Sequence, residues 1–147
     1  MADNETLARS LYDAWNERNF DEMSEAVAPD AQMTVVGTGE TFQGPDGARK
    51  YNTNWANGFP DGMVTVDRIL SSGEYVVVEF TGRGTHTGTL VTSMGDIPAT
   101  GRSLTLHMCD VMRFKDGKVQ EQHSYFDTGS MMAQLGITAE QLAAAKK

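Results

Sequence analysis

Residues 103–127 read SLTLHMCDVMRFKDGKVQEQHSYFD, and this stretch decides the fold. The pair Asp116-Gly117 is typical of a two-residue hairpin turn, and the runs on either side are rich in residues that favour strands. The pattern predicts two long antiparallel strands, Ser103–Lys115 and Lys118–Asp127, joined at that turn.

The turn also predicts which side chains share a face. Counting outward pairs Lys115 with Lys118 and Phe114 with Val119, and an uninterrupted count sets Asp110 opposite His123. Side chains of a strand alternate between the two faces of a sheet, so the pairing assigns each residue to one face. One of the two faces carries more of the large apolar groups, and we take it as concave. Its members are Leu106, Met108, Asp110, Met112, Phe114, Val119, Glu121, His123, Tyr125 and Asp127. The other face carries Thr105, His107, Cys109, Val111, Arg113, Gln120, Gln122, Ser124 and Phe126.

Upstream of this hairpin, helical patterns come first and strand patterns follow. Apolar spacing and turn residues predict helices over Asn4–Asn16, over Asp21–Ala28 and from Pro45 to Gly58, and strands over Ala31–Val36, Glu40–Phe42, Met63–Leu70 and Tyr75–His86. A loop containing Pro98 and Gly101 follows, and the tail from Gly129 is weakly helical. This order predicts an α+β fold, a single domain over 1–147, with N-terminal helices packed on a curled antiparallel sheet. The layout resembles the cone-shaped fold of nuclear transport factor 2.

The charge balance restricts the partners. With 12 basic and 20 acidic residues the chain carries a formal charge of −8, which repels nucleic acid and anionic lipid, so we expect neither nucleic acid nor a membrane as partner. Cys109 is the only cysteine, which fits a reducing, cytoplasmic setting. The charged N-terminus lacks the apolar core of a signal peptide, and no apolar run is long enough to span a membrane.

On the predicted concave face, an imidazole beside a buried carboxylate has what a general base near neutral pH requires. Asp110 and His123 are therefore the first candidates for proton transfer. The alternative is a mutually satisfied pair that only fixes the hairpin. Glu121 and Asp127 share the predicted face, and either could act as a second acid or base.

Other side chains are candidates for lining a ligand pocket. In a hollow fold the core and the pocket lining are the same surface, which selects the aromatic residues of the helices, and Asn52 could present its amide to a ligand carbonyl. The candidate ligand-binding residues are Trp15, Tyr51, Asn52, Trp55, Phe59, His86, His107, Met108 and Tyr125. The three histidines lack the short spacings of metal ligands, so we expect no metal and no cofactor.

Several motifs resemble one family. They are Gly84-Thr85-His86-Thr87-Gly88, Ile97–Arg102, Asp110–Val119 and Gln134-Leu135-Gly136, together with Leu11–Asn16 and Phe59-Pro60-Asp61 near the start. Spread over nearly the whole chain, they are similar to the SnoaL-like polyketide cyclase, or ester cyclase, family. The resemblance implies the cone fold and a homodimer or homotetramer formed through the convex sheet.

For the founding polyketide cyclases, the resemblance further implies cofactor-free aldol ring closure of an aromatic polyketide ester. There an acidic residue on the last strand takes a proton from a carbon next to a carbonyl, helped by a histidine on the preceding strand. This chain differs, because the carboxylate Asp110 lies on the earlier strand and His123 on the last. The family also contains isomerase-like and hydroxylase-like members.

Two functions from different classes follow. The first is a small enzyme that abstracts a proton next to a carbonyl of a hydrophobic or aromatic substrate, with cyclisation or isomerisation as the outcome. The second is a non-catalytic module that binds a small molecule or assembles with other copies through the same cone. Catalysis requires the candidate base to face open volume, whereas a structural pair can be closed off by packing.

Overall fold

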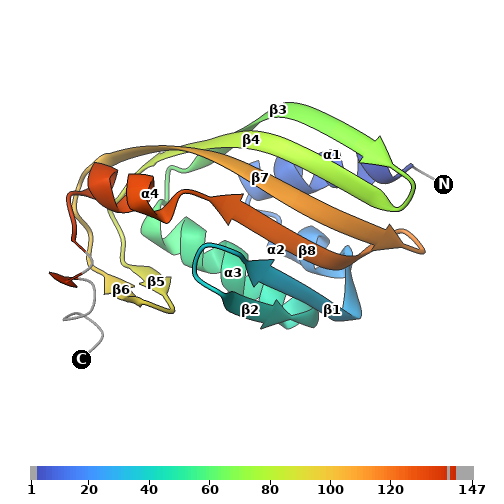
Figure 1. Cartoon of the computed structure of the whole chain (residues 1–147), viewed down its shortest axis with the longest axis horizontal. Helices are drawn as coiled ribbons and strands as arrows, with labels where there is room; N and C mark the ends of the chain where they lie inside the picture. Colours follow the sequence, from blue (N-terminus) through green and yellow to red (C-terminus); the bar gives the residue numbers. More distant parts are fainter. Residues whose placement is uncertain (1–2, 139, 142–147) are drawn as a thin grey trace.

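A computed structural model of the chain describes residues 3–138 and 140–141, and Figure 1 shows it. Helices α1 to α3 lie on one side of a large curled sheet, and α4 follows the last strand. The elements in chain order are α1 (Asn4–Asn16), α2 (Phe20–Glu25), β1 (Val27–Val35), β2 (Glu40–Gln43), α3 (Gly44–Gly58), β3 (Met63–Ser72), β4 (Tyr75–Thr85), β5 (Leu90–Thr92), β6 (Gly95–Ile97), β7 (Ser103–Lys115), β8 (Lys118–Phe126) and α4 (Thr128–Leu135).

The large sheet has six strands in the order β2-β1-β8-β7-β4-β3. The predicted α+β class, with helices packed on a curled sheet, is confirmed. The prediction that the sheet is antiparallel is wrong for one pair, because β1 and β8 run parallel. These strands come from opposite ends of the chain, so no hairpin turn fixes their relative direction.

Helix α1 spans the predicted residues Asn4–Asn16. The Asp3 side chain accepts a hydrogen bond from the Thr6 backbone N–H, which satisfies one of the free donors at the helix start. The buried face of the helix packs against the inner side chains of β4, among them Val76 and Val78. Burial of this apolar stripe places Tyr12 over the middle of the sheet.

The second helix is shorter than predicted. It ends at Glu25, and Val27 already begins strand β1, which contains Pro29. The register between β1 and β8 shifts between Val27 and Gln32. Proline lacks a backbone donor and is tolerated where a strand ladder is interrupted, so Pro29 marks an irregularity in a strand rather than the end of a helix.

A small hairpin, β5–β6, was not predicted from the sequence. Each strand has only three residues, below the length at which alternation is readable, and the pair forms a separate two-stranded sheet. The Gly88 N–H donates to the Gly58 carbonyl at 3.2 Å, which holds the hairpin against the end of α3. A Cβ at Gly88 would lie 1.9 Å from the Asn57 carbonyl oxygen, so this approach requires glycine.

The turn at Asp116-Gly117 forms as predicted, with both residues at positive φ (53° and 76°). Buried apolar side chains collect between the sheet and the helices, so the helix-facing side of the sheet is the concave, inner face. None of the helices in the described ranges combines the length and apolarity needed to cross a bilayer.

Candidate functional site

A cavity of about 130 Å³ lies between α1, α3 and the inner face of the sheet. Its walls are almost entirely apolar, and five methionines contribute to them. These are Met23, Met33, Met63, Met108 and Met112. Methionine side chains are flexible and polarisable, so such a wall can adjust to the shape of an apolar ligand.

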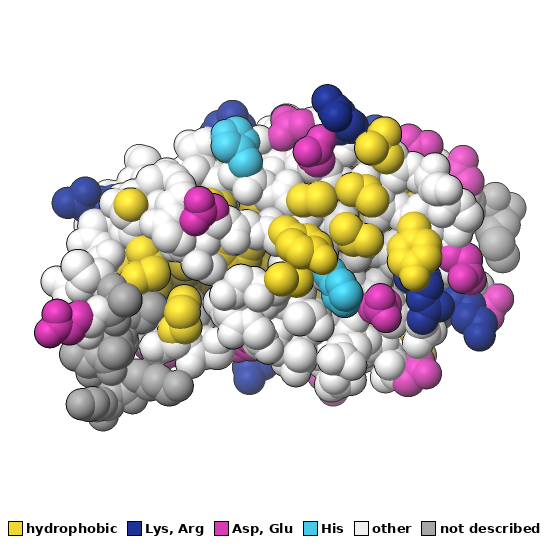
Figure 2. All heavy atoms as spheres, in the orientation of Figure 1, with side chains coloured by type: hydrophobic (Ala, Val, Ile, Leu, Met, Phe, Trp, Pro, Cys, Tyr) yellow, Lys and Arg dark blue, Asp and Glu magenta, His cyan; other side chains and the backbone are white. Residues whose placement is uncertain are grey.

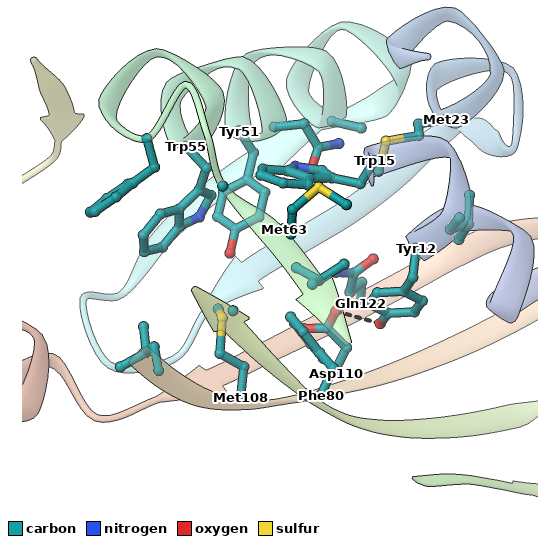
Figure 3. Close-up of a pocket in the computed structure, with 18 of the residues that line it drawn as sticks. Tyr12, Trp15, Met23, Tyr51, Trp55, Met63, Phe80, Met108, Asp110 and Gln122 are labelled. Atoms are coloured by element: carbon teal, nitrogen blue, oxygen red, sulfur yellow. Dashed lines mark hydrogen bonds between the residues drawn. The ribbon is translucent and has the colours of Figure 1, made fainter. Parts of the chain in front are cut away.

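One carboxyl group lies on the floor of this cavity. Asp110 is 6% exposed, and both of its oxygens accept hydrogen bonds. The Tyr12 hydroxyl donates to Oδ2 at 2.6 Å, and the Ser124 hydroxyl donates to Oδ1 at 2.7 Å. The Gln122 amide in turn donates to the Ser124 hydroxyl at 3.1 Å. Figure 3 shows Tyr12 reaching from α1 to Asp110, with Gln122 beside them.

Burial controls the ionisation of this group. Loss of hydration raises the pKa of Asp110 from 3.8 to about 6, and the hydrogen bonds from Tyr12 and Ser124 act in the opposite direction. The same burial, together with the Asp110 charge, raises the pKa of Tyr12 well above 10. Tyr12 therefore remains a hydrogen-bond donor, while Asp110 gains and loses a proton near neutral pH.

Two aromatic residues of α3 approach the cavity from the opposite side. Figure 3 shows the side chains of Tyr51 and Trp55 pointing from the helix into the cavity toward Met108. Burial is the largest of the effects that raise the pKa of Tyr51, and the neighbouring Trp55 and Ser124 side chains act in the opposite direction. The neutral Tyr51 hydroxyl can thus donate a hydrogen bond inside an apolar space.

Six of the predicted ligand-binding residues line this cavity. They are Trp15, Tyr51, Asn52, Trp55, Phe59 and Met108. Asp110 joins them as predicted. The structure does not bring His123, the predicted partner of Asp110, to the cavity.

The predicted register of the hairpin is wrong beyond Val119. The pairs Lys115–Lys118 and Phe114–Val119 form as predicted, but the next pair is Arg113 with Glu121. Gln120 is therefore an extra residue, a β-bulge, and every side chain after it changes face. The residue opposite Asp110 is Ser124, and His123 lies opposite Val111 on the convex face.

The bulge moves three candidate residues out of the site. His123 and Glu121 lie on the convex face, 42% and 46% exposed, with 3.9 Å between His123 Nε2 and Glu121 Oε1. Tyr125 follows on the same face and is 42% exposed. Gln122, Ser124 and Phe126, which were predicted to be convex, point inward instead. A cross-strand pair of Asp110 and His123 does not exist, and the reason for assigning His123 as the base is lost.

Asp127 and His107 also lie outside the cavity. The Asp127 side chain caps α4 by accepting a hydrogen bond from the Ser130 N–H at 3.0 Å. His107 lies on the convex face as predicted, and its Nδ1 is 3.2 Å from the Thr81 hydroxyl, which donates to Asp67 at 2.6 Å. A convex hollow next to β7 and β8 has His107, Tyr125 and Asp127 in its lining.

His86 was predicted at the pocket rim but is fully buried behind Phe59. The two rings stack with centroids 5.2 Å apart. Nδ1 accepts a hydrogen bond from the Thr100 N–H at 3.2 Å and lies 2.9 Å from the Thr100 hydroxyl. Burial lowers the pKa of His86, so the neutral ring ties the loop before β7 to the end of β4.

Sequence reasoning missed Tyr12, Gln122 and Ser124 as members of the site. The sequence did contain a signal that Gln122 and Ser124 face inward. The uninterrupted register would bury three ionisable residues, Glu121, His123 and Asp127, and would expose Phe126. Burying fewer ionisable groups favours a bulge. Tyr12 was identified only as part of the apolar stripe of α1. Within the described part of the chain, no group of three or more His, Cys, Asp or Glu side chains is arranged to hold a metal ion.

Comparison with known proteins identifies the family and the fold. The family profile described as SnoaL-like polyketide cyclase matches residues 5–135. No curated protein matches the chain.

Among solved structures, IdmH from Streptomyces antibioticus, a candidate polyketide cyclase, is 30% identical, with a TM-score of 0.73 over 90% of this chain and 97% of that one. An NTF2-like protein of unknown function from Burkholderia pseudomallei is 27% identical, with a TM-score of 0.74 over 92% and 98% of the two chains. TsrD from Streptomyces laurentii is similar in fold, with a TM-score of 0.78 at 22% identity over 94% and 100%.

Proposed function

Because the chain belongs to the SnoaL-like polyketide cyclase family, we propose that its cavity abstracts a proton from a carbon next to a carbonyl group of an apolar, aromatic small molecule. Asp110 is the base in this proposal, in place of His123. The observation that carries it is a single buried carboxyl group, with its pKa raised to about 6, on the floor of an apolar cavity. A base of this pKa is largely ionised at neutral pH and still strong enough to accept a proton.

The proposed step needs one base and one donor. The proton leaves the substrate carbon for a carboxylate oxygen of Asp110, and the electron pair of the C–H bond moves to the carbonyl oxygen, which becomes an enolate. Tyr12 and Ser124 hold the carboxylate in place through their hydrogen bonds. Tyr51 and the Trp55 indole are the donors that can stabilise the enolate oxygen from the α3 side. Attack of the enolate on a second carbonyl gives cyclisation, and return of the proton to another carbon gives isomerisation.

Exchange of deuterium into a bound ketone tests the proton transfer without knowledge of the natural substrate. With 2-tetralone as the probe, we expect the protein to accelerate exchange at the carbon next to the carbonyl, measured by NMR. Asp110→Asn should lower the rate by about 10²–10⁴-fold, because it removes the base and keeps the shape of the side chain. Tyr12→Phe should have a smaller effect, since Tyr12 only positions the carboxylate.

A second candidate function is a non-catalytic ligand-binding module. It is favoured by the fact that both Asp110 oxygens already have hydrogen-bond partners. In that case 2-tetralone binds without accelerated exchange, and Asp110→Asn changes stability alone. Either result would contradict the enzymatic proposal.

We also propose that the convex face of the sheet pairs with a second copy of the chain. Figure 2 shows hydrophobic side chains gathered at the centre of this face. Its exposed members include Val36, Leu70, Tyr75 and Tyr125, each at least 42% exposed. An apolar patch of this kind, bordered by charges, is typical of an interface. Sedimentation that gives only a 16.0 kDa species at micromolar concentration would contradict the pairing.

A further inference from the structure

A second, smaller hollow of about 40 Å³ lies on the far side of Tyr51 and Trp55. It is bounded by α3, by the β1–β2 pair and by the β5–β6 hairpin, and Phe126 forms part of its wall. Tyr51 and Trp55 are the two residues that line both this hollow and the main cavity. The wall between the two spaces is therefore made of these two aromatic side chains.

This wall is held by ring contacts. The Trp55 ring lies 6.4 Å from that of Tyr51, 6.0 Å from Phe59 and 5.6 Å from Phe126, measured between centroids. Both wall residues are only partly buried and stand on α3, opposite the sheet. An elongated ligand would have to turn these two rings into other rotamers to pass from one space to the other.

A single row of residues on the sheet runs beneath both spaces. Asp110 on β7 pairs with Ser124 on β8, Ser124 with Val35 on β1, and Val35 with Glu40 on β2. Directly paired residues project from the same face of a sheet, so Glu40 and Asp110 share the concave side. Three steps between neighbouring strands separate them, which corresponds to about 14 Å along the sheet.

Both ends of this row carry a carboxyl group, Asp110 at one end and Glu40 at the other. Glu40 is one of the few polar groups of the small hollow, together with Thr38, Asn54 and Thr92. Partial burial raises the pKa of Glu40, while Lys50 acts in the opposite direction. Each of the two hollows thus has one carboxyl group in its lining, and the rings of Tyr51 and Trp55 lie between the hollows.

We propose that the two hollows form one binding site for an elongated, mostly apolar ligand that runs from Asp110 to Glu40 and places a hydroxyl group against Glu40. The assignment rests on the proposed function, in which the reacting carbonyl lies at the Asp110 end. It adds a substrate class, namely molecules with two or more linked or fused rings and a hydrogen-bond donor at the end remote from the reaction. A ligand with a carboxylate at that end is disfavoured, because it would meet the charge of Glu40.

Two probes that differ by one hydroxyl group test the site. These are 4,4′-dihydroxybiphenyl and 4-hydroxybiphenyl, and 2-naphthol serves as a short ligand that fits the main cavity alone. Dissociation constants can be measured from the fluorescence of Trp15 and Trp55, which both line the cavity, and checked by calorimetry. We expect the dihydroxy probe to bind about tenfold more tightly than the monohydroxy probe, since its second hydroxyl donates to a charged acceptor.

The variants separate this site from the Asp110 end. Glu40→Gln should reduce the tenfold preference to below about threefold and leave 2-naphthol binding unchanged, because only the charged acceptor is lost. Glu74→Gln, the same substitution at an exposed turn position, is the matched control and should keep the preference. Asp110→Asn should weaken the two biphenyls equally, so that their ratio is retained.

The outcomes are distinct. Equal affinity of the wild-type protein for the two biphenyls overturns the inference, as does a preference that survives in Glu40→Gln. Binding of 2-naphthol without binding of either biphenyl overturns the extended site but leaves the proposed function standing. Failure of all three ligands overturns the extended site together with the aromatic ligand class.

Discussion

The β7–β8 hairpin presents two different environments on its two faces. On the concave face, Asp110 is 6% exposed and receives hydrogen bonds from two hydroxyl groups. On the convex face, His123 is 42% exposed and lies 3.9 Å from the Glu121 carboxylate. By residue type the exposed pair is the better acid–base pair. Burial moves the pKa of the Asp110 carboxyl group toward neutrality, so the position of a group, and not only its type, decides whether it can do proton chemistry.

The bulge at Gln120 creates this difference. Its side-chain amide donates to Asp30 on β1 at 2.8 Å, next to Pro29, where the β1–β8 ladder is itself interrupted. Both neighbouring strands are therefore irregular at the same level of the sheet. Beyond this point the bulge turns Ser124 inward and His123 outward.

Deletion of Gln120 is expected to have the largest effect. Without the extra residue, β8 must either expose Phe126 and bury Glu121 and His123, or lose its pairing with β7. Burial of unpaired charges is costly, so we expect a loss of more than about 4 kcal/mol in the free energy of unfolding, or no folded protein. Chemical denaturation followed by circular dichroism measures this.

The control keeps the number of residues. Gln120→Ala removes the hydrogen bond to Asp30 but retains the bulge, so its cost should stay below about 1 kcal/mol. A deletion variant as stable as the wild type would show that the bulge does not determine the two faces.

A smaller effect is expected from the charge on Asp110. Its pKa is raised from 3.8 to about 6 in the folded protein, so the folded state binds the proton more tightly than the unfolded state. The contribution of Asp110 to the free energy of unfolding is therefore greatest below pH 4. It falls as the pH rises to about 6 and stays constant above that. The shift corresponds to about 3 kcal/mol.

Comparison with Asp110→Asn isolates this contribution, because the other carboxylates titrate in both proteins. Between pH 4 and pH 7 the free energy of unfolding of the wild type should fall by about 2 kcal/mol relative to the variant. Parallel curves for the two proteins would mean that Asp110 titrates normally. The ionised form that costs stability is also the form that accepts a proton in the proposed reaction.

The fold could be predicted from local signals, and the site only in part. The Asp116-Gly117 turn and the apolar stripe of α1 act over a few residues, so their elements were predicted with correct bounds or nearly so. The position of Asp110 in the cavity followed from the strand pattern of β7. The inward direction of Ser124 depends instead on a bulge opposite Pro29, on a strand from the other end of the chain. The bond from Tyr12 to Asp110 joins residues 98 positions apart, and no local pattern encodes it.

The smallest expected effect is that of His123→Ala. The side chain is 42% exposed, and its contact with the exposed Glu121 carboxylate is long, at 3.9 Å. Exposed ion pairs contribute about 0–1 kcal/mol, so the free energy of unfolding should change by less than about 1 kcal/mol. Deuterium exchange into 2-tetralone should stay within about twofold of the wild-type rate, since no concave group is lost. Both proteins must be compared at a concentration where sedimentation gives one species, because the convex face is the proposed interface. A folded His123→Ala variant that no longer catalyses exchange would move the chemistry to the convex face of the sheet, and Asp110→Asn would then retain its activity.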